Sequence, residues 1–215
     1  MTSADSNIGI ESLGQIDYRC ALQRMQSEHE AVVDGRSRGV ILFCEHPPVY
    51  TAGRRTEEGT APEGAVAIER GGRVTFHGPG QLVVYPIVRL PHRDLGDWLR
   101  RLERFGMAVC ESFGLEARPS VDGTGVFVGD SKVASIGVAV RRWVNLHGIS
   151  INGQMDLAAW HKIRPCGLDP DRISDLASKL GRDVELSELE AAAQDALDLL
   201  IDPALRVDPH DDTRS

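Results

Sequence analysis

The run LVVYPIVRL at residues 82–90 is almost continuously apolar. A strand with one face in water alternates apolar and polar residues, so an unbroken apolar run is typical of a strand covered on both faces. Shorter runs of strand type lie at residues 39–46, 65–70 and 73–77, and residues 123–152 hold two or three more. The chain therefore predicts a central sheet with other elements packed on each side.

Helical patterns precede, interrupt and follow these strands. Residues 15–34 carry apolar side chains at helical spacing, and Asp94 can cap a second helix over residues 95–113. Two further helices are expected over residues 171–181 and 187–201, the second with Ser187 and Glu190 as a capping box. Strands flanked in this way predict a single α/β domain with a mixed central β-sheet.

Composition and charge exclude some classes of protein. No stretch approaches the roughly 18 to 20 apolar residues of a membrane-spanning helix. The first residues lack the basic and apolar regions of a signal peptide, so we expect a cytoplasmic address. The formal net charge of −8 argues against nucleic acid as a partner.

Arginines nevertheless gather between residues 70 and 104, either as a basic patch for an acidic partner or as a solvated helix face. They are Arg70, Arg73, Arg89, Arg93, Arg100, Arg101 and Arg104.

The four cysteines are scattered and form no CxxC pair, so we expect free thiols rather than disulfides. Cys20, Cys44 and Cys110 lie in apolar patterns that favour small core side chains. Cys44 and His46 could supply half of a zinc site, but the sequence offers no second half, so we expect no metal.

Lys132 and Cys166 stand near the two ends of residues 131–168. Cys166 lies between Pro165 and Gly167, outside any periodic run and just before an expected helix. Amides at a helix start and a nearby cation lower the pKa of a thiol from about 8.5, which makes Cys166 a candidate nucleophile. A lysine can lose its proton where an arginine cannot, so Lys132 is a candidate base. An exposed lysine beside a hairpin turn fits the same residues.

Glycines and prolines crowd residues 70–81, RGGRVTFHGPGQ, so the backbone there can approach a ligand closely. The segment lacks the third glycine of a dinucleotide fingerprint and the Gly-Lys-Ser/Thr of a phosphate loop. Two hairpin turns around a strand would also explain the glycines. His77 is either a base facing a ligand or a histidine hydrogen-bonded within the turn.

Four blocks of the chain, RGGRVTFHGPGQLVVYP, GDSKVASIGVAV, HGISIN and IRPCG, occur in an order that resembles the lipoyl(octanoyl) transferases. That family shares one fold superfamily with the biotin and lipoate protein ligases. The match runs from the first expected helix to just past Cys166. It departs mildly at Ile149 and Ser150, where the family usually has Leu-Ala. We expect a flexible N-terminus over residues 1–14, a catalytic domain over 15–205 and, from its polar composition, a disordered tail over 206–215.

The resemblance also implies roles for particular residues. Cys166 would be the nucleophile that carries the acyl group as a thioester, and Lys132 would lower its pKa and handle protons. Apolar lining is expected from Phe76, Ala134 and Ile136, together with Val138. Three walls of an acyl pocket would be formed by Arg70, Gly71, Gly72, Arg73, Val74, Thr75, Phe76 and His77, by Ser135, Ile136 and Gly137, and by Gly148, Ile149 and Ser150.

The implied activity moves an octanoyl group from octanoyl-acyl carrier protein, through the Cys166 thioester, to a lysine of a lipoyl domain. The acceptors would be the lipoyl domains of 2-oxoacid dehydrogenase E2 subunits and the glycine cleavage H protein. No cofactor or ATP is expected, because the thioester is already activated, and a monomer is expected. Three alternatives are an ATP-dependent lipoate or biotin ligase, a non-catalytic acyl-carrier binding module, and a hydrolase pairing Cys166 with His77 or His161.

Overall fold

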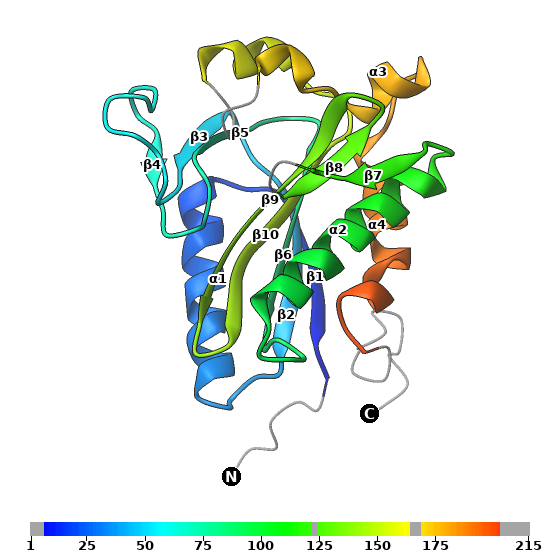
Figure 1. The fold of residues 1–215 in the computed structure, drawn as a ribbon. Coiled ribbons are helices and arrows are strands. Elements are labelled where there is room, and N and C mark those ends of the chain that lie inside the picture. The colour runs from blue at the N-terminus through cyan, green and yellow to red at the C-terminus, as the bar shows by residue number, and fades with distance from the viewer. Residues whose placement is uncertain (1–6, 122–123, 164–168, 203–215) are drawn as a thin grey trace.

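The computed structural model describes residues 7–121, 124–163 and 169–202. Within them a seven-stranded sheet has the order β1-β2-β6-β10-β9-β8-β7, and a three-stranded sheet has the order β4-β3-β5 (Figure 1). β1 runs parallel to β2, and the other neighbours in the large sheet are antiparallel, so the sheet is mixed as expected. The strands are β1 Gly9–Gln15, β2 Gly39–Glu45, β3 Val49–Ala52, β4 Val66–Ala67, β5 Val74–His77, β6 Gln81–Val88, β7 Ala117–Pro119, β8 Gly125–Val128, β9 Ser131–Arg141 and β10 Val144–Asn152.

Helices cover both faces of the large sheet. α1 lies on one face, and α2 and α4 lie on the other (Figure 1). Every residue of β6 is buried, and its side chains alternate between the two layers. Val83 and Tyr85 pack with Met25 of α1, whereas Leu82 and Val84 join the core beneath α2 and α4. The apolar run that predicted a doubly covered strand is therefore confirmed. The helices are α1 Tyr18–Val33, α2 Leu95–Ser112, α3 Leu176–Leu180 and α4 Leu186–Asp195, with 3-10 turns at Leu157–Lys162 (η1), Pro170–Arg172 (η3) and Leu197–Leu199 (η4).

Helix starts show one confirmed cap and one wrong prediction. The Asp94 side chain accepts a hydrogen bond from the Asp97 N–H, so it caps α2 as predicted. The capping box of Ser187 and Glu190 does not form, because α4 begins at Leu186 and Ser187 lies inside its first turn. Leu186 and Leu189 both pack on the main core, which accounts for the earlier start of the helix.

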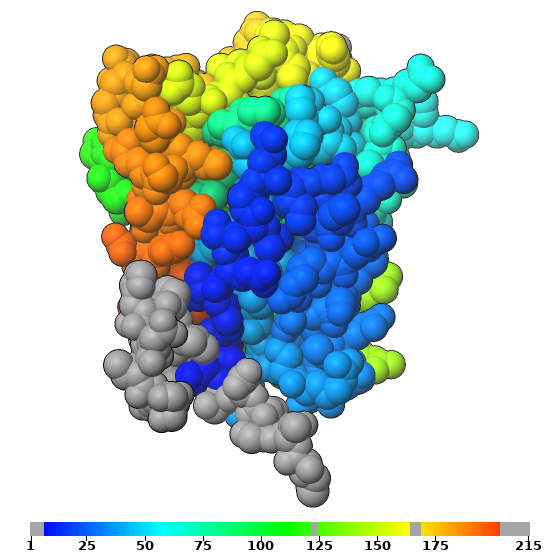
Figure 2. All heavy atoms as spheres, turned by 180° about the vertical axis from the view of Figure 1, so that it is seen from behind, coloured from blue at the N-terminus to red at the C-terminus, as the bar shows by residue number. Residues whose placement is uncertain are grey.

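The N-terminal segment corrects another expectation. Residues 9–14 were expected to be flexible, but they belong to β1, which pairs in parallel with β2 from Gly9↔Val40 onward. Figure 2 shows this stretch between α1 and the C-terminal helices, and Ser12 Oγ donates to Glu190 of α4 at 3.3 Å. Backbone pairing at a sheet edge holds the segment, and its seven residues carry no strong apolar alternation that would have predicted a strand.

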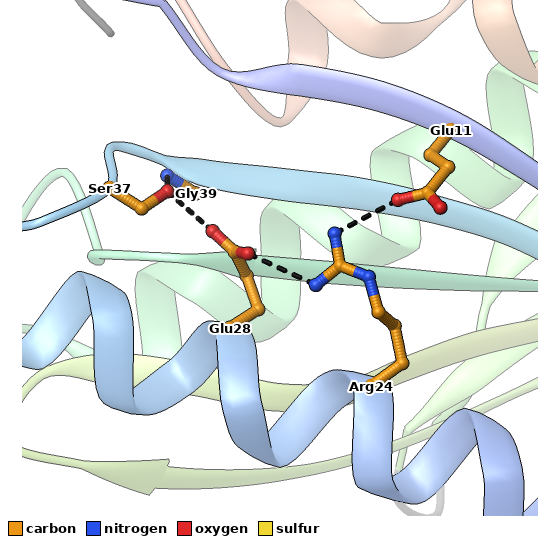
Figure 3. A network of polar contacts seen from close by, with 5 residues as sticks. All are labelled: Glu11, Arg24, Glu28, Ser37 and Gly39. Atoms are coloured by element: carbon orange, nitrogen blue, oxygen red, sulfur yellow. Dashed lines mark hydrogen bonds and ion pairs between the residues drawn. The ribbon is translucent and has the colours of Figure 1, made fainter. Parts of the chain in front are cut away.

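A polar network ties this edge strand to α1 and β2 (Figure 3). The Arg24 guanidinium donates to Glu11 of β1 at 2.9 Å and to Glu28 one turn along α1 at 3.0 Å. Ser37 Oγ donates to the other oxygen of Glu28 and accepts from the Gly39 N–H at 3.0 Å. These contacts hold β1 against α1 and the start of β2, at one edge of the large sheet. None of the helices in the described part of the chain has the length and apolarity to cross a bilayer.

Candidate active site

A cavity of about 470 Å³ lies between the large sheet, the small sheet and the first turns of α1 and α2. This volume falls in the range of about 300–1,000 Å³ that is usual for small-molecule sites. Lys132 lines it, and so do all the predicted wall residues except two. Those that line it are Arg70, Gly71, Gly72, Arg73, Thr75, His77, Ser135, Ile136, Gly137, Gly148, Ile149 and Ser150.

The two exceptions, Val74 and Phe76, face away from the cavity. Successive side chains of a strand point to opposite faces, so Thr75 and His77 reach the cavity while Val74 and Phe76 do not. Val74 and Phe76 pack instead in a separate apolar cluster with Trp160. Their assignment to the acyl pocket is wrong for this reason. Ala134 was also expected to line the cavity, but it packs in the main core and is not part of the lining.

Strand register brings the remaining wall segments together. Ser135, Ile136 and Gly137 of β9 lie directly opposite Ser150, Ile149 and Gly148 of β10. The Arg70–Arg73 segment lies against β9, where the Gly71 N–H donates to the Val138 carbonyl at 2.9 Å. A β-carbon on Gly137 would lie 2.7 Å from Arg70 Cδ, so only glycine lets that arginine cross the strand so closely. The three segments predicted as walls therefore do border one cavity.

Lys132 is buried rather than exposed. It follows the hairpin turn between β8 and β9, which forms as predicted, and it is only 5% exposed. Lys132 Nζ donates to the Thr124 carbonyl at 3.0 Å. A β-carbon on Gly125 would lie 2.5 Å from Lys132 Cε, so this glycine leaves room for the lysine side chain. The interpretation of Lys132 as an exposed lysine is therefore wrong. A buried lysine on a cavity wall can exchange a proton with a group bound in the cavity.

Cys166 lies outside the described residues, so its approach to Lys132 stays a prediction. The other cysteines do not replace it. Burial raises the pKa of the Cys44 and Cys110 thiols to about 12, so neither supplies a thiolate at neutral pH. Both are buried as expected, whereas Cys20 is exposed, because the buried stripe of α1 passes through its neighbour Ala21.

His77 both faces the cavity and is hydrogen-bonded within the turn, while its action as a base stays a prediction. It lines the cavity, and its Nδ1 donates to Gln81 Oε1 at 2.6 Å within the turn. Burial lowers the pKa of His77 to about 3, so the ring is neutral at physiological pH. A neutral imidazole with a protonated Nδ1 keeps Nε2 as a hydrogen-bond acceptor.

Three aromatic residues of the cavity were missed by the sequence analysis. Tyr18 of α1 stacks on His77 with ring centroids 6.1 Å apart. Tyr85 of β6 donates its hydroxyl to His46 Nε2 at 2.9 Å, while His46 Nδ1 donates to a backbone carbonyl. Because the protein uses both nitrogens of His46, the suggested half of a zinc site serves as a structural contact.

His147 is the third missed residue, and its backbone is unusual. It has φ = 62°, a left-handed conformation that is rare for residues other than glycine. Its Nε2 is buried and has no hydrogen-bond partner among the described residues. Burial, and then the nearby Arg70 guanidinium, lower the pKa of His147 to about 3. The HGISIN motif could have indicated His147 as a cavity residue, but the sequence analysis began the predicted pocket wall at Gly148. The cavity is completed by Arg54, Arg55, Val83, Leu95, Leu99, Thr124 and Val138.

Comparisons with known proteins agree with this geometry. Residues 17–198 match the family model described as lipoyl protein ligase A/B catalytic domain. An octanoyltransferase of Salinispora tropica is 39% identical over 213 residues, covering 94% of this chain and 100% of the relative. An octanoyltransferase of Geobacter metallireducens is 40% identical over 201 residues, covering 91% and 94%.

Solved structures show the same fold at low identity. A lipoate-protein ligase A bound with ATP has a TM-score of 0.68 at 16% identity, covering 89% of this chain and 83% of that one. A lipoate protein ligase from Thermoplasma acidophilum with bound lipoic acid has a TM-score of 0.70 at 17% identity, covering 89% and 85%. A biotin protein ligase from Aquifex aeolicus, with biotin and ATP, has a TM-score of 0.55 at 13% identity, covering 89% and 70%. The expected ligase-like α/β fold is confirmed.

Proposed function

The chain belongs to the family of lipoyl protein ligase A/B catalytic domains, and we propose that it transfers an octanoyl group in protein lipoylation. Identity of about 40% to octanoyltransferases over nearly the whole chain bears out the prediction of octanoyl transfer. The observation that carries the proposal is the buried Lys132 on a cavity whose other walls are the family's own motifs.

The donor we propose is octanoyl-acyl carrier protein. The Cys166 thiolate attacks the carbonyl carbon of the donor thioester, a new carbon–sulfur bond forms, and the carrier leaves as its thiolate. The products are an octanoyl-enzyme and a free carrier thiol. Because one thioester replaces another, the step needs no ATP. Lys132, as a cation, would favour the thiolate form of Cys166 before the attack.

The acceptor is a lysine of a lipoyl domain, as found in 2-oxoacid dehydrogenase E2 subunits and the glycine cleavage H protein. Its neutral amine attacks the octanoyl-enzyme, an amide bond forms, and the Cys166 thiolate leaves. The attacking nitrogen must lose a proton, and Lys132 is the buried amine that we propose accepts it. An amide is more stable than a thioester, so the transfer proceeds downhill.

Apolar side chains of the cavity supply binding energy for the acyl chain. Each buried methylene contributes about 0.8 kcal/mol, so an eight-carbon chain gains several kcal/mol when it lies in an apolar slot. Such contacts come from Val83 of β6, from Ile136 and Val138 of β9, and from Ile149 of β10. The polar serines at positions 135 and 150 lie opposite each other across these strands.

Fewer of the arginines between residues 70 and 104 are available for docking than the sequence suggested. Arg70 is buried, and Arg101 is tied to Asp97 at 2.9 Å, so neither is a strong docking residue. Arg100 is more exposed, and its ion pairs to Asp94 and Asp97 are long, at 3.9 Å. It lies on the α2 turn beside Leu99, which lines the cavity. Acyl carrier proteins and lipoyl domains are typically acidic, so we propose Arg100 as a docking residue.

Charge reversal tests the docking proposal. Arg100→Glu should weaken the affinity for octanoyl-acyl carrier protein at low salt, and the loss should shrink as salt screens the interaction. An unchanged affinity at low salt would contradict it. The cytoplasmic address and the monomeric state stay predictions.

An assay without ATP tests the function itself. The protein, octanoyl-acyl carrier protein and a lipoyl domain are mixed, and the lipoyl domain is followed by intact mass. We expect an octanoylated domain and an equal amount of free carrier thiol. Strict dependence on ATP would favour a ligase instead, and release of free octanoate would favour a hydrolase.

A further inference from the structure

Two motif residues take no part in the chemistry proposed above. Gln81 ends the HGPGQ motif at the start of β6, and Asn152 ends the HGISIN motif at the end of β10. They face each other in the sheet register, and they are 0% and 4% exposed. Buried amides need hydrogen-bond partners, so their contacts show what they hold in place.

The side chains form a chain of hydrogen bonds with one direction. His77 Nδ1 donates to Gln81 Oε1 at 2.6 Å, and Gln81 Nε2 donates to Asn152 Oδ1 at 2.9 Å. Asn152 Nδ2 then donates to the Ser174 carbonyl at 2.8 Å. The last acceptor is a backbone carbonyl, which can only accept, so the orientation of both amides follows from it.

The chain of hydrogen bonds ends at the segment that contacts Lys132. Ser174 accepts from Asn152 through its carbonyl, and its own N–H donates to the Lys132 carbonyl at 3.0 Å. Ile173 pairs with Lys132 in a parallel bridge. In sequence, this segment follows the stretch that contains Cys166, and Ser174 lies eight residues after that cysteine. Asn152 therefore contacts the only described strand-like segment between Cys166 and α3.

We propose that Gln81 and Asn152 are positioning residues for the reacting pair, acting through Ser174. Asn152 holds the Ile173–Ser174 segment against the backbone of Lys132, and Gln81 holds the Asn152 amide in the orientation that donates to Ser174. The proposal rests on the proposed function, because it assigns these amides a role in the Cys166–Lys132 reaction. It also explains why the two motifs end in Gln and Asn, which can donate and accept at once.

The isosteric variant Asn152→Asp removes the donor to Ser174 and keeps the size of the side chain. A misplacement of about 1 Å near reacting groups costs roughly 100-fold in rate. We expect the rate of octanoyl-enzyme formation in a single turnover to fall about 10- to 100-fold, with KM for octanoyl-acyl carrier protein within about twofold of wild type. Gln81→Glu should lower the same rate in the same direction, because a carboxylate cannot donate to Asn152.

Asn145→Asp is the matched control. Asn145 lies at the other end of β10, is 0% exposed, and donates to the Pro86 and His147 carbonyls at 2.8 and 2.9 Å. It loses comparable buried hydrogen bonds but has no contact with Ser174. Because His147 lines the cavity, Asn145→Asp is expected to change KM for the donor. Its single-turnover rate of octanoyl-enzyme formation at saturating donor should stay near that of wild type at temperatures where thermal unfolding shows all three proteins folded. If Asn152→Asp does not fold, Asn152→Ala replaces it, since alanine buries no charge.

A second readout does not depend on octanoyl transfer. The rate at which iodoacetamide alkylates Cys166 is measured against pH by peptide mass spectrometry, with the exposed Cys20 as the internal reference. In Asn152→Asp the alkylation midpoint of Cys166 should move up toward that of an ordinary thiol, because Lys132 no longer lies where it favours the thiolate. Asn145→Asp and the Cys20 midpoint should match wild type.

The outcomes separate the two proposals. If wild-type protein transfers octanoate without ATP, but Asn152→Asp and Asn145→Asp share the same rate and the same Cys166 midpoint, the positioning proposal is overturned and the function stands. If wild type makes no octanoylated domain, the function is overturned, and a shifted Cys166 midpoint in Asn152→Asp alone still supports positioning.

Discussion

Shortening the donor from an octanoyl to a hexanoyl group removes two methylenes from the acyl slot. The length of that slot can be estimated from strand register. Lys132 Nζ donates to the Thr124 carbonyl, and Thr124 Oγ1 donates to the Ile136 carbonyl at 3.1 Å, so the amine lies near the Ser135–Ile136 level of β9. From Ser135 to Val138, which pairs with His147, is three residues, or roughly 10 Å at about 3.4 Å per residue.

An eight-carbon chain fits this distance. An extended hydrocarbon with bonds of about 1.5 Å advances about 1.25 Å per bond, so seven bonds span roughly 9 Å. Removing two methylenes at about 0.8 kcal/mol each costs about 1.6 kcal/mol, which lowers kcat/KM roughly 15-fold. A decanoyl chain would pass the Val138–His147 pair, where the neutral imidazole and the buried Arg70 offer little apolar contact. We therefore expect octanoyl to exceed both neighbours in kcat/KM.

The assay compares hexanoyl-, octanoyl- and decanoyl-acyl carrier protein as donors to one lipoyl domain, with the product followed by intact mass. The variant His147→Asn should raise the ratio of decanoyl to octanoyl activity, because asparagine is shorter and tolerates positive φ. His29→Asn, on α1 outside the cavity lining, is its control. Hexanoyl activity within about threefold of octanoyl would refute the reasoning, since the loss of two buried methylenes predicts a difference of roughly 15-fold. Decanoyl activity above octanoyl would refute the proposed end of the slot at the Val138–His147 pair.

Three further predictions follow from single side chains. His77 and His147 have pKa values of about 3 in the folded protein, whereas a histidine in the unfolded chain has a pKa near 6.5. Between pH 6.5 and 3 only the unfolded chain binds these protons. The free energy of unfolding should therefore fall on acidification, by up to about 1.4 kcal/mol per pH unit for each histidine. Urea unfolding at pH 7 and 5 checks this, and equal stabilities would contradict it. Lys132→Arg should lower amide formation at least about 100-fold in single-turnover assays, because arginine keeps its proton; near-normal transfer would remove Lys132 as the base. Asp94→Ala should cost about 1 kcal/mol in urea unfolding through the lost cap of α2, and no change would show that the cap is unimportant.

The central sheet could be predicted because the residues of β6 alone, without any long-range contact, have the apolar pattern of a buried strand. Its unbroken apolar run requires cover on both faces, and the structure places α1 on one face and α2 with α4 on the other. The edge strand β1 was missed because pairing with β2 depends on contacts more than 25 residues away, and its own side chains are only partly buried.

The cavity was predicted in part. Motif resemblance named contiguous residues of β5, but strand alternation turns Val74 and Phe76 away from the cavity and leaves Thr75 and His77 facing it. A resemblance of whole blocks does not distinguish the two faces of a strand. Tyr18 was missed for another reason: it reaches the cavity from α1, and only the packing of that helix against the sheet brings its ring onto His77.

Burial separated two interpretations of Lys132, of which the residues alone favoured the exposed lysine and the family resemblance favoured the base. The sequence pattern fitted either an exposed lysine beside a hairpin turn or a buried base. In the structure the Lys132 side chain is buried against Gly125, so it is a residue of the cavity wall. The roles of Lys132 and Cys166 in the reaction stay proposals, because Cys166 lies outside the described residues.

The covalent intermediate is the central claim, and one measurement tests it most directly. The protein is mixed with octanoyl-acyl carrier protein, quenched in acid and weighed intact, beside the variants Cys166→Ala and Cys20→Ala. We predict one octanoyl adduct on wild type and on Cys20→Ala, and none on Cys166→Ala. An adduct that persists in Cys166→Ala, or none on wild type while the lipoyl domain is still octanoylated, would contradict the thioester mechanism.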